Sequence, residues 1–332
     1  MTAVRPGADA EEFLLRARRL TGPALRDAVR RLPEPTRGIA EYHFSWDHGQ
    51  AGKSVRAALV LAAAEALHGP PEDAVSGAAG VELVHNFSLI HDDLMDRDPL
   101  RRTRPTVWSA YGDSQAILTG DALLVVAMHV LADHPPVLRE VCAALLALVD
   151  GQSADLAFES RTDVGLDECV RMAALKTGAL LASSCAIGGM LARAEPARVE
   201  ALRRFGHHLG LAFQLVDDIL GIWGQTQVSG KPVGADLRRR KKSLPVVAAL
   251  NAGGSHARRL REIYHPGAGP LDDDDIQSAA ELIELAGGRA WAERQAEHHR
   301  TGAMAALAAA EPTGEGAEIL VALATLVCRR DR

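Results

Sequence analysis

Apolar residues recur along most of the chain at spacings of three and four, which is the period of an amphipathic α-helix. We find no convincing stretch in which apolar and polar residues alternate, and no Asn-Gly pair that would close a β-hairpin. The pattern therefore predicts an all-α protein. The expected helices cover about 9–32, 52–68, 72–97, 105–132, 136–160, 166–193, 195–224, 236–251, 255–264, 272–310 and 314–329.

The breaks between these helices carry the usual Gly and Pro punctuation. The interrupting segments are GPPED at 69, DHPP at 133, AEPA at 194, GQTQVSGKPVG at 224 and HPGAGP at 265. Several of the predicted helices, such as 115–132 and 178–192, are apolar nearly all round, as expected for helices in the middle of a bundle. We expect one domain over 1–332, with residues 1–10 or so flexible.

Composition narrows the class of protein. The 332 residues are 47% hydrophobic and carry a net charge of only −6, so nucleic acid is not an expected partner. The four cysteines are scattered and indicate neither a zinc site nor a disulfide framework. The N-terminus lacks the apolar stretch of a signal peptide, and apolar runs such as GALLASSCAIGGMLA are shorter than the roughly 20 residues of a membrane span. We therefore expect a cytoplasmic protein with no membrane span.

One short stretch, SLIHDDLMDRDPLRRTR at 88–104, combines acids and bases at the end of an apolar helix. Asp92 and Asp96 are four residues apart and so share a helix face, with Asp93 beside them. Like charges near a helix C-terminus destabilise it, so a bound cation must offset the cost. Carboxylate oxygens without thiolates suit Mg²⁺, and the arginines that follow suit phosphate. The combination predicts a diphosphate held through metal.

A weaker echo occurs at 211–242, where LAFQLVDDILG is followed by Lys231, Asp236 and the run RRRKK. The acids of LDDDDIQ at 271–277 differ from both clusters, because they follow a Pro/Gly loop and open a helix. Acids are favourable at that end of a helix, so we interpret this run as structural.

The segments GKSVRAALVL, LVHNFSLIHDDLMDRDPLRRTRPTV, AILTGDALL, KTGALL and GLAFQLVDDILGIWG…GKPVGADLRRRKKSLPVV resemble the trans-isoprenyl diphosphate synthases, also called polyprenyl synthetases. The match runs in register from about 45 to 250, and the chain is most similar to an actinobacterial geranylgeranyl diphosphate synthase. The resemblance implies a bundle of antiparallel helices around a deep central cavity, assembled as a homodimer. The substrates would be isopentenyl diphosphate and an allylic diphosphate: dimethylallyl, geranyl or farnesyl.

The resemblance also implies roles for individual residues. Three Mg²⁺ ions would be bound by Asp92, Asp96 and Asp217, supported by Asp93 and Asp218. The allylic diphosphate would be clamped by Arg101, Lys176 and Lys231, and the diphosphate of isopentenyl diphosphate would be held by Lys53, Arg56, His85 and Arg102. Thr177 and Gln214 would lie along the allylic chain. His85 alone would more often be an ordinary helix histidine, and only the surrounding motif favours binding. The chemistry needs no side-chain general base.

The chain departs from the family pattern at two positions. Gly221 stands where the second motif normally ends in an aspartate, and Ala57 stands where a proline usually follows the arginine. We expect metal binding to survive the first change and the second to matter little. Terpene cyclases share this fold and keep one alternative open, although a cyclase would have little use for the basic set. A non-catalytic partner subunit is a further alternative, disfavoured because the aspartates are present.

Product length depends on what blocks the cavity below the first motif. Ser88 and Phe87 precede Asp92 by four and five residues, and so lie roughly 6–7.5 Å deeper along the helix. Val84, about one turn deeper again, is small. We expect geranylgeranyl diphosphate as product, with farnesyl diphosphate as the alternative.

Overall fold

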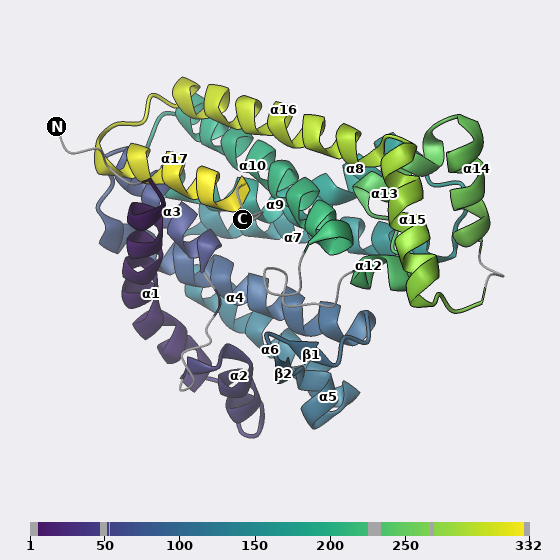
Figure 1. The fold of residues 1–332 in the computed structure, drawn as a ribbon. Coiled ribbons are helices and arrows are strands. Elements are labelled where there is room, and N and C mark those ends of the chain that lie inside the picture. Colours follow the sequence, from purple (N-terminus) through teal and green to yellow (C-terminus); the bar gives the residue numbers. More distant parts are fainter. Residues whose placement is uncertain (1–5, 47–51, 53, 225–233, 266–268, 329–332) are drawn as a thin grey trace. The chain divides into compact units, whose positions relative to one another are not determined.

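The computed structural model describes residues 6–46, 52, 54–224, 234–265 and 269–328, and almost all of the regular structure in these ranges is helical (Figure 1). The all-α prediction is confirmed. The longer helices are α1 (Pro6–Arg30), α3 (Val55–Ala66), α4 (Pro71–Met95), α6 (Asp113–Leu131), α7 (Pro135–Ser160), α9 (Ala179–Leu191), α10 (Pro196–Trp223), α15 (Asp273–Leu285), α16 (Gly288–Ala309) and α17 (Gly314–Cys328). The shorter ones are α2 (Thr36–Phe44), α5 (Val107–Tyr111), α8 (Leu166–Ala173), the π-helical turn η2 (Ala174–Gly178), α12 (Ala235–Arg238), α13 (Leu244–Asn251) and α14 (Gly254–Ile263).

Four of the expected elements differ from those observed, each for a local reason. Helix α2 was missed because it spans only two to three turns and shows little periodicity. The expected helix 105–132 is split at Gly112 and the helix 272–310 at Gly287, both of which have positive φ. The expected helix 236–251 is split into α12 and α13, and Pro245 lies in the first turn of α13. Residues 6–10 lie within α1, and the five residues before them lie outside the described part.

The described chain also contains a small hairpin that the sequence pattern did not predict. Strands β1 (Leu100–Arg101) and β2 (Arg104–Pro105) pair antiparallel, with Arg101 opposite Arg104. Two residues per strand are too few for a visible alternation of apolar and polar side chains. The turn residues Arg102 and Thr103 have φ values of 51° and 67°. Two left-handed residues in succession are typical of the type I′ turn, which normally uses Asn and Gly.

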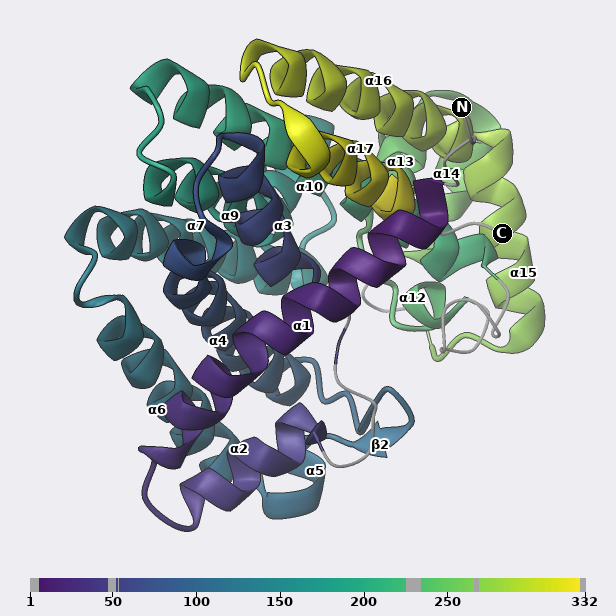
Figure 2. The same ribbon diagram turned by 90° about the vertical axis from the view of Figure 1, so that its left-hand side faces the viewer.

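The chain divides into two units, the first formed by 1–145, 183–203 and 307–323, and the second by 146–182, 204–306 and 324–332. In the first unit, α4 packs against α1, α3 and α6, and Figure 2 shows α1 crossing in front of it. Gly80 allows close approach to Leu131 of α6, and Gly77 allows close approach to Ile187 and Leu191 of α9. The apolar character of α4 on nearly all sides follows from this burial.

The second unit has two apolar clusters. One joins α7, α8, α10, α13 and α16 around Phe158, Leu211 and Val247. The other joins the end of α10 to α12, α13, α14 and α15 around Leu237 and Ile283. The single domain expected from the sequence stays a prediction.

Among the described residues, three helical stretches are long and apolar enough to cross a membrane by length and composition: Asp113–Leu131, Pro135–Ser160 and Leu166–Leu191. This corrects the expectation that apolar stretches fall short of that length, which considered only charge-free runs. Most of the third stretch is buried inside the protein, which explains its composition. Less than half of each of the first two is buried.

Candidate active site

The first acidic cluster occupies the last turn of α4, in the first unit. Asp93 is 2% exposed, and its carboxylate accepts two hydrogen bonds from Arg101 Nε at 2.9 Å and one from Nη2 at 2.7 Å. Burial raises the pKa of Asp93, and Arg101 opposes that rise. Asp92 and Asp96 are partly exposed and share a helix face. Asp93 therefore positions Arg101, whereas Asp92 and Asp96 lie where an ion can reach them.

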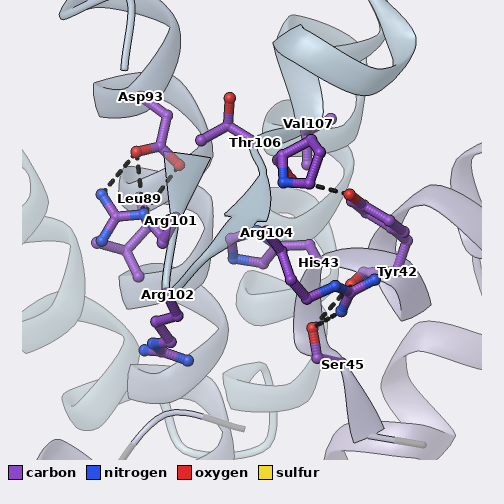
Figure 3. A pocket seen from close by; sticks show the side chains of 11 residues that line it. Tyr42, His43, Ser45, Leu89, Asp93, Arg101, Arg102, Arg104, Thr106 and Val107 are labelled. Carbon is purple, nitrogen blue, oxygen red and sulfur yellow. Dashed lines mark hydrogen bonds and ion pairs between the residues drawn. The ribbon is translucent and has the colours of Figure 1, made fainter. Parts of the chain in front are cut away.

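The hairpin separates the two consecutive arginines. Neighbouring residues of a strand point to opposite faces, so Arg101 and Arg102 diverge. Figure 3 shows Arg101 turned toward Asp93 and Arg102 pointing away from it. Arg102 lies against Gly52, where an added Cβ would be 2.9 Å from its Nη1. The left-handed turn that produces this divergence costs of order 1–3 kcal/mol per strained residue, which is typical of functional segments.

Arg102 belongs with a second basic group. Arg56, at the start of α3, donates from Nη1 to His85 Nε2 at 3.0 Å. Burial lowers the pKa of His85 well below its ordinary value, and the neighbouring arginines lower it further. His85 is therefore neutral and accepts from Arg56. Lys53, predicted to join this group, lies outside the described residues.

Three polar residues behind this group were missed by the sequence analysis. His43 on α2 lies with Nε2 3.1 Å from Asn86 Oδ1, and Asn86 Nδ2 donates to the backbone oxygen of Glu82 at 2.7 Å. Burial lowers the pKa of His43 to about 3, so the ring is neutral. Glu82 accepts a hydrogen bond from the backbone N–H of Ala57. Proline at position 57 could not donate that bond, so the departure from the family pattern has a structural consequence. The one signal in the sequence is that Glu82 and Asn86 are polar within an apolar helix.

A small pocket lies between the hairpin and α2 (Figure 3). Its cavity volume is about 30 Å³, enough for water but not for a diphosphate. Arg104 closes one side: it packs 4.4 Å above the Tyr42 ring and donates to Ser45 Oγ. Tyr42 in turn donates to the backbone oxygen of Pro105 at 2.9 Å. These contacts anchor the hairpin to α2 and so fix the direction of both arginines.

The second acidic cluster lies on α10, in the second unit. Asp217 is exposed, whereas Asp218 is 4% exposed and accepts from Gln214 Nε2 at 2.7 Å and from the backbone N–H of Leu244 at 2.9 Å. Burial raises the pKa of Asp218 to about 7, although Lys241 opposes the rise. Asp218 therefore joins α10 to α13, and Asp217 is the acid open to an ion.

Lys176 and Thr177 lie in the π-helical turn η2, a feature that is frequent at functional sites. The close approach of Gly151 on α7, where an added Cβ would be 2.9 Å from Lys176 Cα, is possible only without a side chain. Lys176 Nζ pairs with Asp155 Oδ2 at 2.6 Å, and the Thr177 hydroxyl donates to Gln214 Oε1 at 2.6 Å. The structure thus connects Thr177 through Gln214 to Asp218. Asp155 was not identified from the sequence, and Lys231 lies outside the described residues.

The space left by the missing aspartate at position 221 is occupied. A Cβ on Gly221 would lie 3.0 Å from Asp236 Cγ and nearer still to Oδ2. Asp236, 15 residues further along the chain, therefore places its carboxylate where the side chain of residue 221 would stand. The second cluster keeps an acid at this position even though the motif lacks one.

Residues 38–283 match the family described as Polyprenyl synthetase. The chain belongs to this family. A (2E,6E)-farnesyl diphosphate synthase of Mycobacterium tuberculosis is 50% identical over 299 residues, covering 86% of this chain and 83% of the relative. A geranylgeranyl diphosphate synthase of the same organism is 45% identical over 338 residues, covering 98% and 95%.

Solved structures of polyprenyl synthetases agree with the fold. A polyprenyl synthetase from Streptomyces coelicolor A3(2) superposes with a TM-score of 0.90 at 45% identity, covering 95% of this chain and 98% of that one. A geranylgeranyl pyrophosphate synthase from Corynebacterium glutamicum, complexed with calcium and isoprenyl diphosphate, has a TM-score of 0.81 at 29% identity, covering 96% of each chain. The predicted family and the isoprenoid synthase fold are confirmed, and the protein is a trans-prenyltransferase.

Polyprenyl synthetases depend on magnesium, and the acids fit such an ion. Asp92, Asp96 and Asp217 offer only carboxylate oxygens, the donors that Mg²⁺ prefers. Among the described residues, no group of three or more His, Cys, Asp or Glu side chains is gathered closely enough to hold a metal. Mg²⁺ typically keeps waters and takes phosphate oxygens besides one or two carboxylates, so this sparse set is the expected one.

Proposed function

We propose that the protein condenses isopentenyl diphosphate with an allylic diphosphate, head to tail, and extends the product to geranylgeranyl diphosphate. The observation that carries the proposal is the divergence of two consecutive arginines. Arg101 lies with the aspartates, and Arg102 lies with the group formed by Arg56 and His85. Two separate diphosphate-binding groups fit a reaction of two diphosphate substrates. A cyclase, which ionises one, needs a single group.

In the first unit, Asp92 and Asp96 are the proposed ligands of magnesium, and Asp93 keeps Arg101 directed at the allylic diphosphate. In the second unit, Asp217 is a proposed ligand, and Lys176 is the proposed phosphate contact. Bound Mg²⁺, proposed as three ions, would neutralise negative charge on the leaving diphosphate. The arginines and lysine stabilise the same charge as it develops.

The bonds change in a balanced order. The allylic C1–O bond breaks, and diphosphate leaves with the electron pair. The double bond of isopentenyl diphosphate then attacks C1 and forms the new C–C bond, while its diphosphate is held by Arg56, His85 and Arg102. A proton is lost from the adduct to the departing diphosphate. Water must be excluded throughout, because it would capture the allylic cation.

Product length is proposed from α4. Phe87 and Val84 are buried on this helix, and the Phe87 ring packs edge-on against His91 at 4.9 Å. Ser88 is partly exposed, and its hydroxyl donates to the backbone oxygen of His85 at 2.8 Å. The nearly full-length match to a geranylgeranyl diphosphate synthase supports the C20 product. Farnesyl diphosphate is the second candidate, supported by the 50% identity to farnesyl diphosphate synthases.

A product assay tests the proposal. Purified protein with Mg²⁺ and labelled isopentenyl diphosphate is offered dimethylallyl, geranyl and farnesyl diphosphates in turn. We expect a longer prenyl diphosphate, lost in Asp92→Ala, and its chain length decides between the C15 and C20 products. Release of diphosphate and a hydrocarbon without incorporation of isopentenyl diphosphate would replace the proposal by a cyclase.

We further propose a homodimer in the cytoplasm. In the first unit, α6 exposes Ile117, Leu118 and Val125 on one face, and in the second unit α7 exposes Leu146 and Val149. A second copy that covers these side chains would account for apolar helices that are less than half buried. Light scattering should give twice the monomer mass, and Val125→Lys should reduce it. A monomeric wild type that sediments with membranes would support a lipid contact instead.

A further inference from the structure

Glu82 is a buried acid among bases. It lies on α4 one turn before His85, is 6% exposed, and stands between the apolar residues Val81 and Leu83. Its carboxylate is close enough to Arg56, Arg102 and Arg18 for all three to act on it electrostatically. These arginines come from three elements: α3, the hairpin turn and α1. The acid is the common neighbour of cations that are far apart in the sequence.

One contact of Glu82 fixes a helix end. Ala57 is the third residue of α3, and its backbone N–H donates to the Glu82 carboxylate. Ser54, at the N-cap of α3, makes no side-chain capping bond. An acid from another helix therefore caps α3, where the helix dipole favours a negative charge. Because Arg56 directly precedes Ala57, the cap also fixes the backbone that carries Arg56.

The remaining oxygen of Glu82 gives this acid a cost. Oε2 is buried and has no hydrogen-bond partner among the described residues. Burial raises the pKa of Glu82, and the three arginines lower it. Burying a carboxylate with an unsatisfied oxygen is unfavourable compared with an apolar side chain of similar size. Packing and capping of α3 alone do not require the charge.

We propose that Glu82 is a positioning residue for the second diphosphate, the one carried by isopentenyl diphosphate. Its negative charge reduces the repulsion between Arg56 and Arg102 and keeps both guanidinium groups in place before the substrate arrives. Arg18 joins the same group from α1. The inference rests on the proposed function, because it assigns Glu82 to the isopentenyl diphosphate group.

Two effects of the charge have opposite signs, and this makes the inference testable. An acid near an anionic ligand repels it, so removing the charge would tighten diphosphate binding if repulsion were the whole effect. If the acid positions the arginines, removing the charge weakens binding. Glu82→Gln keeps an oxygen for the Ala57 N–H and removes only the charge. Glu82→Asp keeps the charge on a shorter side chain.

Steady-state kinetics and calorimetric titration with isopentenyl diphosphate test the inference. We expect Glu82→Gln to raise the KM and Kd for isopentenyl diphosphate about tenfold, with the KM for the allylic substrate and kcat within twofold. Glu82→Asp should recover part of the affinity. Glu65→Gln is the matched control, since Glu65 is another largely buried acid of this unit and pairs with Arg16 at 2.9 Å. It should lower the melting temperature but leave both KM values unchanged.

The failure of the inference is distinct from that of the proposed function. If the wild type incorporates isopentenyl diphosphate but Glu82→Gln binds it equally or more tightly, the positioning role is overturned and the proposed function stands. If the wild type neither incorporates nor binds isopentenyl diphosphate, the proposed function fails first. Should Glu82→Gln unfold, Glu82→Asp carries the test. An unchanged Kd for isopentenyl diphosphate in that variant counts against the inference.

Discussion

Gly221→Ala should destabilise the protein only while Asp236 is present. The added Cβ would lie 3.0 Å from Asp236 Cγ and nearer still to Oδ2, whereas ordinary contacts begin at about 3.4 Å. The carboxylate must therefore rotate away, and overpacking of this kind costs about 1–3 kcal/mol. Alanine in a helix is favoured over glycine by about 0.8–1 kcal/mol. The two terms give a net destabilisation of about 1 kcal/mol in the wild-type background.

In an Asp236→Ala background the obstruction is gone and only the helix preference remains, so the same substitution should stabilise by up to about 1 kcal/mol. The coupling between the two positions is then about 2 kcal/mol, well above the usual error of additivity for independent sites. Thermal unfolding of the wild type, both single variants and the double variant measures it. Equal shifts in melting temperature from Gly221→Ala in the two backgrounds would refute the close contact.

Three further predictions concern other parts of the chain. His43 has a folded pKa of about 3, below its unfolded value of about 6.5; the unfolded state then binds more protons between these values, so stability should fall by about 2 kcal/mol between pH 7 and pH 5. Urea titrations of His43→Gln should show a smaller fall, and an equal one would contradict the neutral ring. Asp155→Asn breaks the 2.6 Å pair with Lys176 and should cost about 2 kcal/mol; Asp150→Asn, which removes an exposed pair, should cost less than about 0.5 kcal/mol. Phe87→Ala should lengthen the product in the chain-length assay, and an unchanged product removes Phe87 from the explanation.

Features built from consecutive residues on one helix were predictable. Asp92 and Asp96 share a face because of helix geometry alone, and the run at 271–277 does open α15, with Asp272 Oδ1 accepting from the N–H of Asp275 at 2.8 Å. Features that depend on distant partners were not. Periodicity does not reveal that Asp218 would be buried and Asp217 exposed, because the difference depends on the backbone of Leu244.

The missed residues share a physical cause. Glu82 is one polar letter in an apolar helix, and its meaning comes from Ala57 and Arg102, which lie on other elements. Asp236 is separated from Gly221 by a loop, so the motif alone indicates a lost acid where the structure has a replaced one. The π-helical turn at Lys176 follows from the close approach of Gly151 and leaves no mark in the hydrophobic pattern.

The two-residue strand that carries Arg101 and Arg102 makes them parts of one lever. Any tilt that brings Arg101 closer to its anion must also move Arg102, because a single peptide unit joins them and the Arg104 contacts hold the hairpin to α2. Occupancy of one diphosphate group should therefore change the affinity of the other, and linkage requires the two effects to be equal. A hairpin of this size would then set the order in which the enzyme fills with its two substrates.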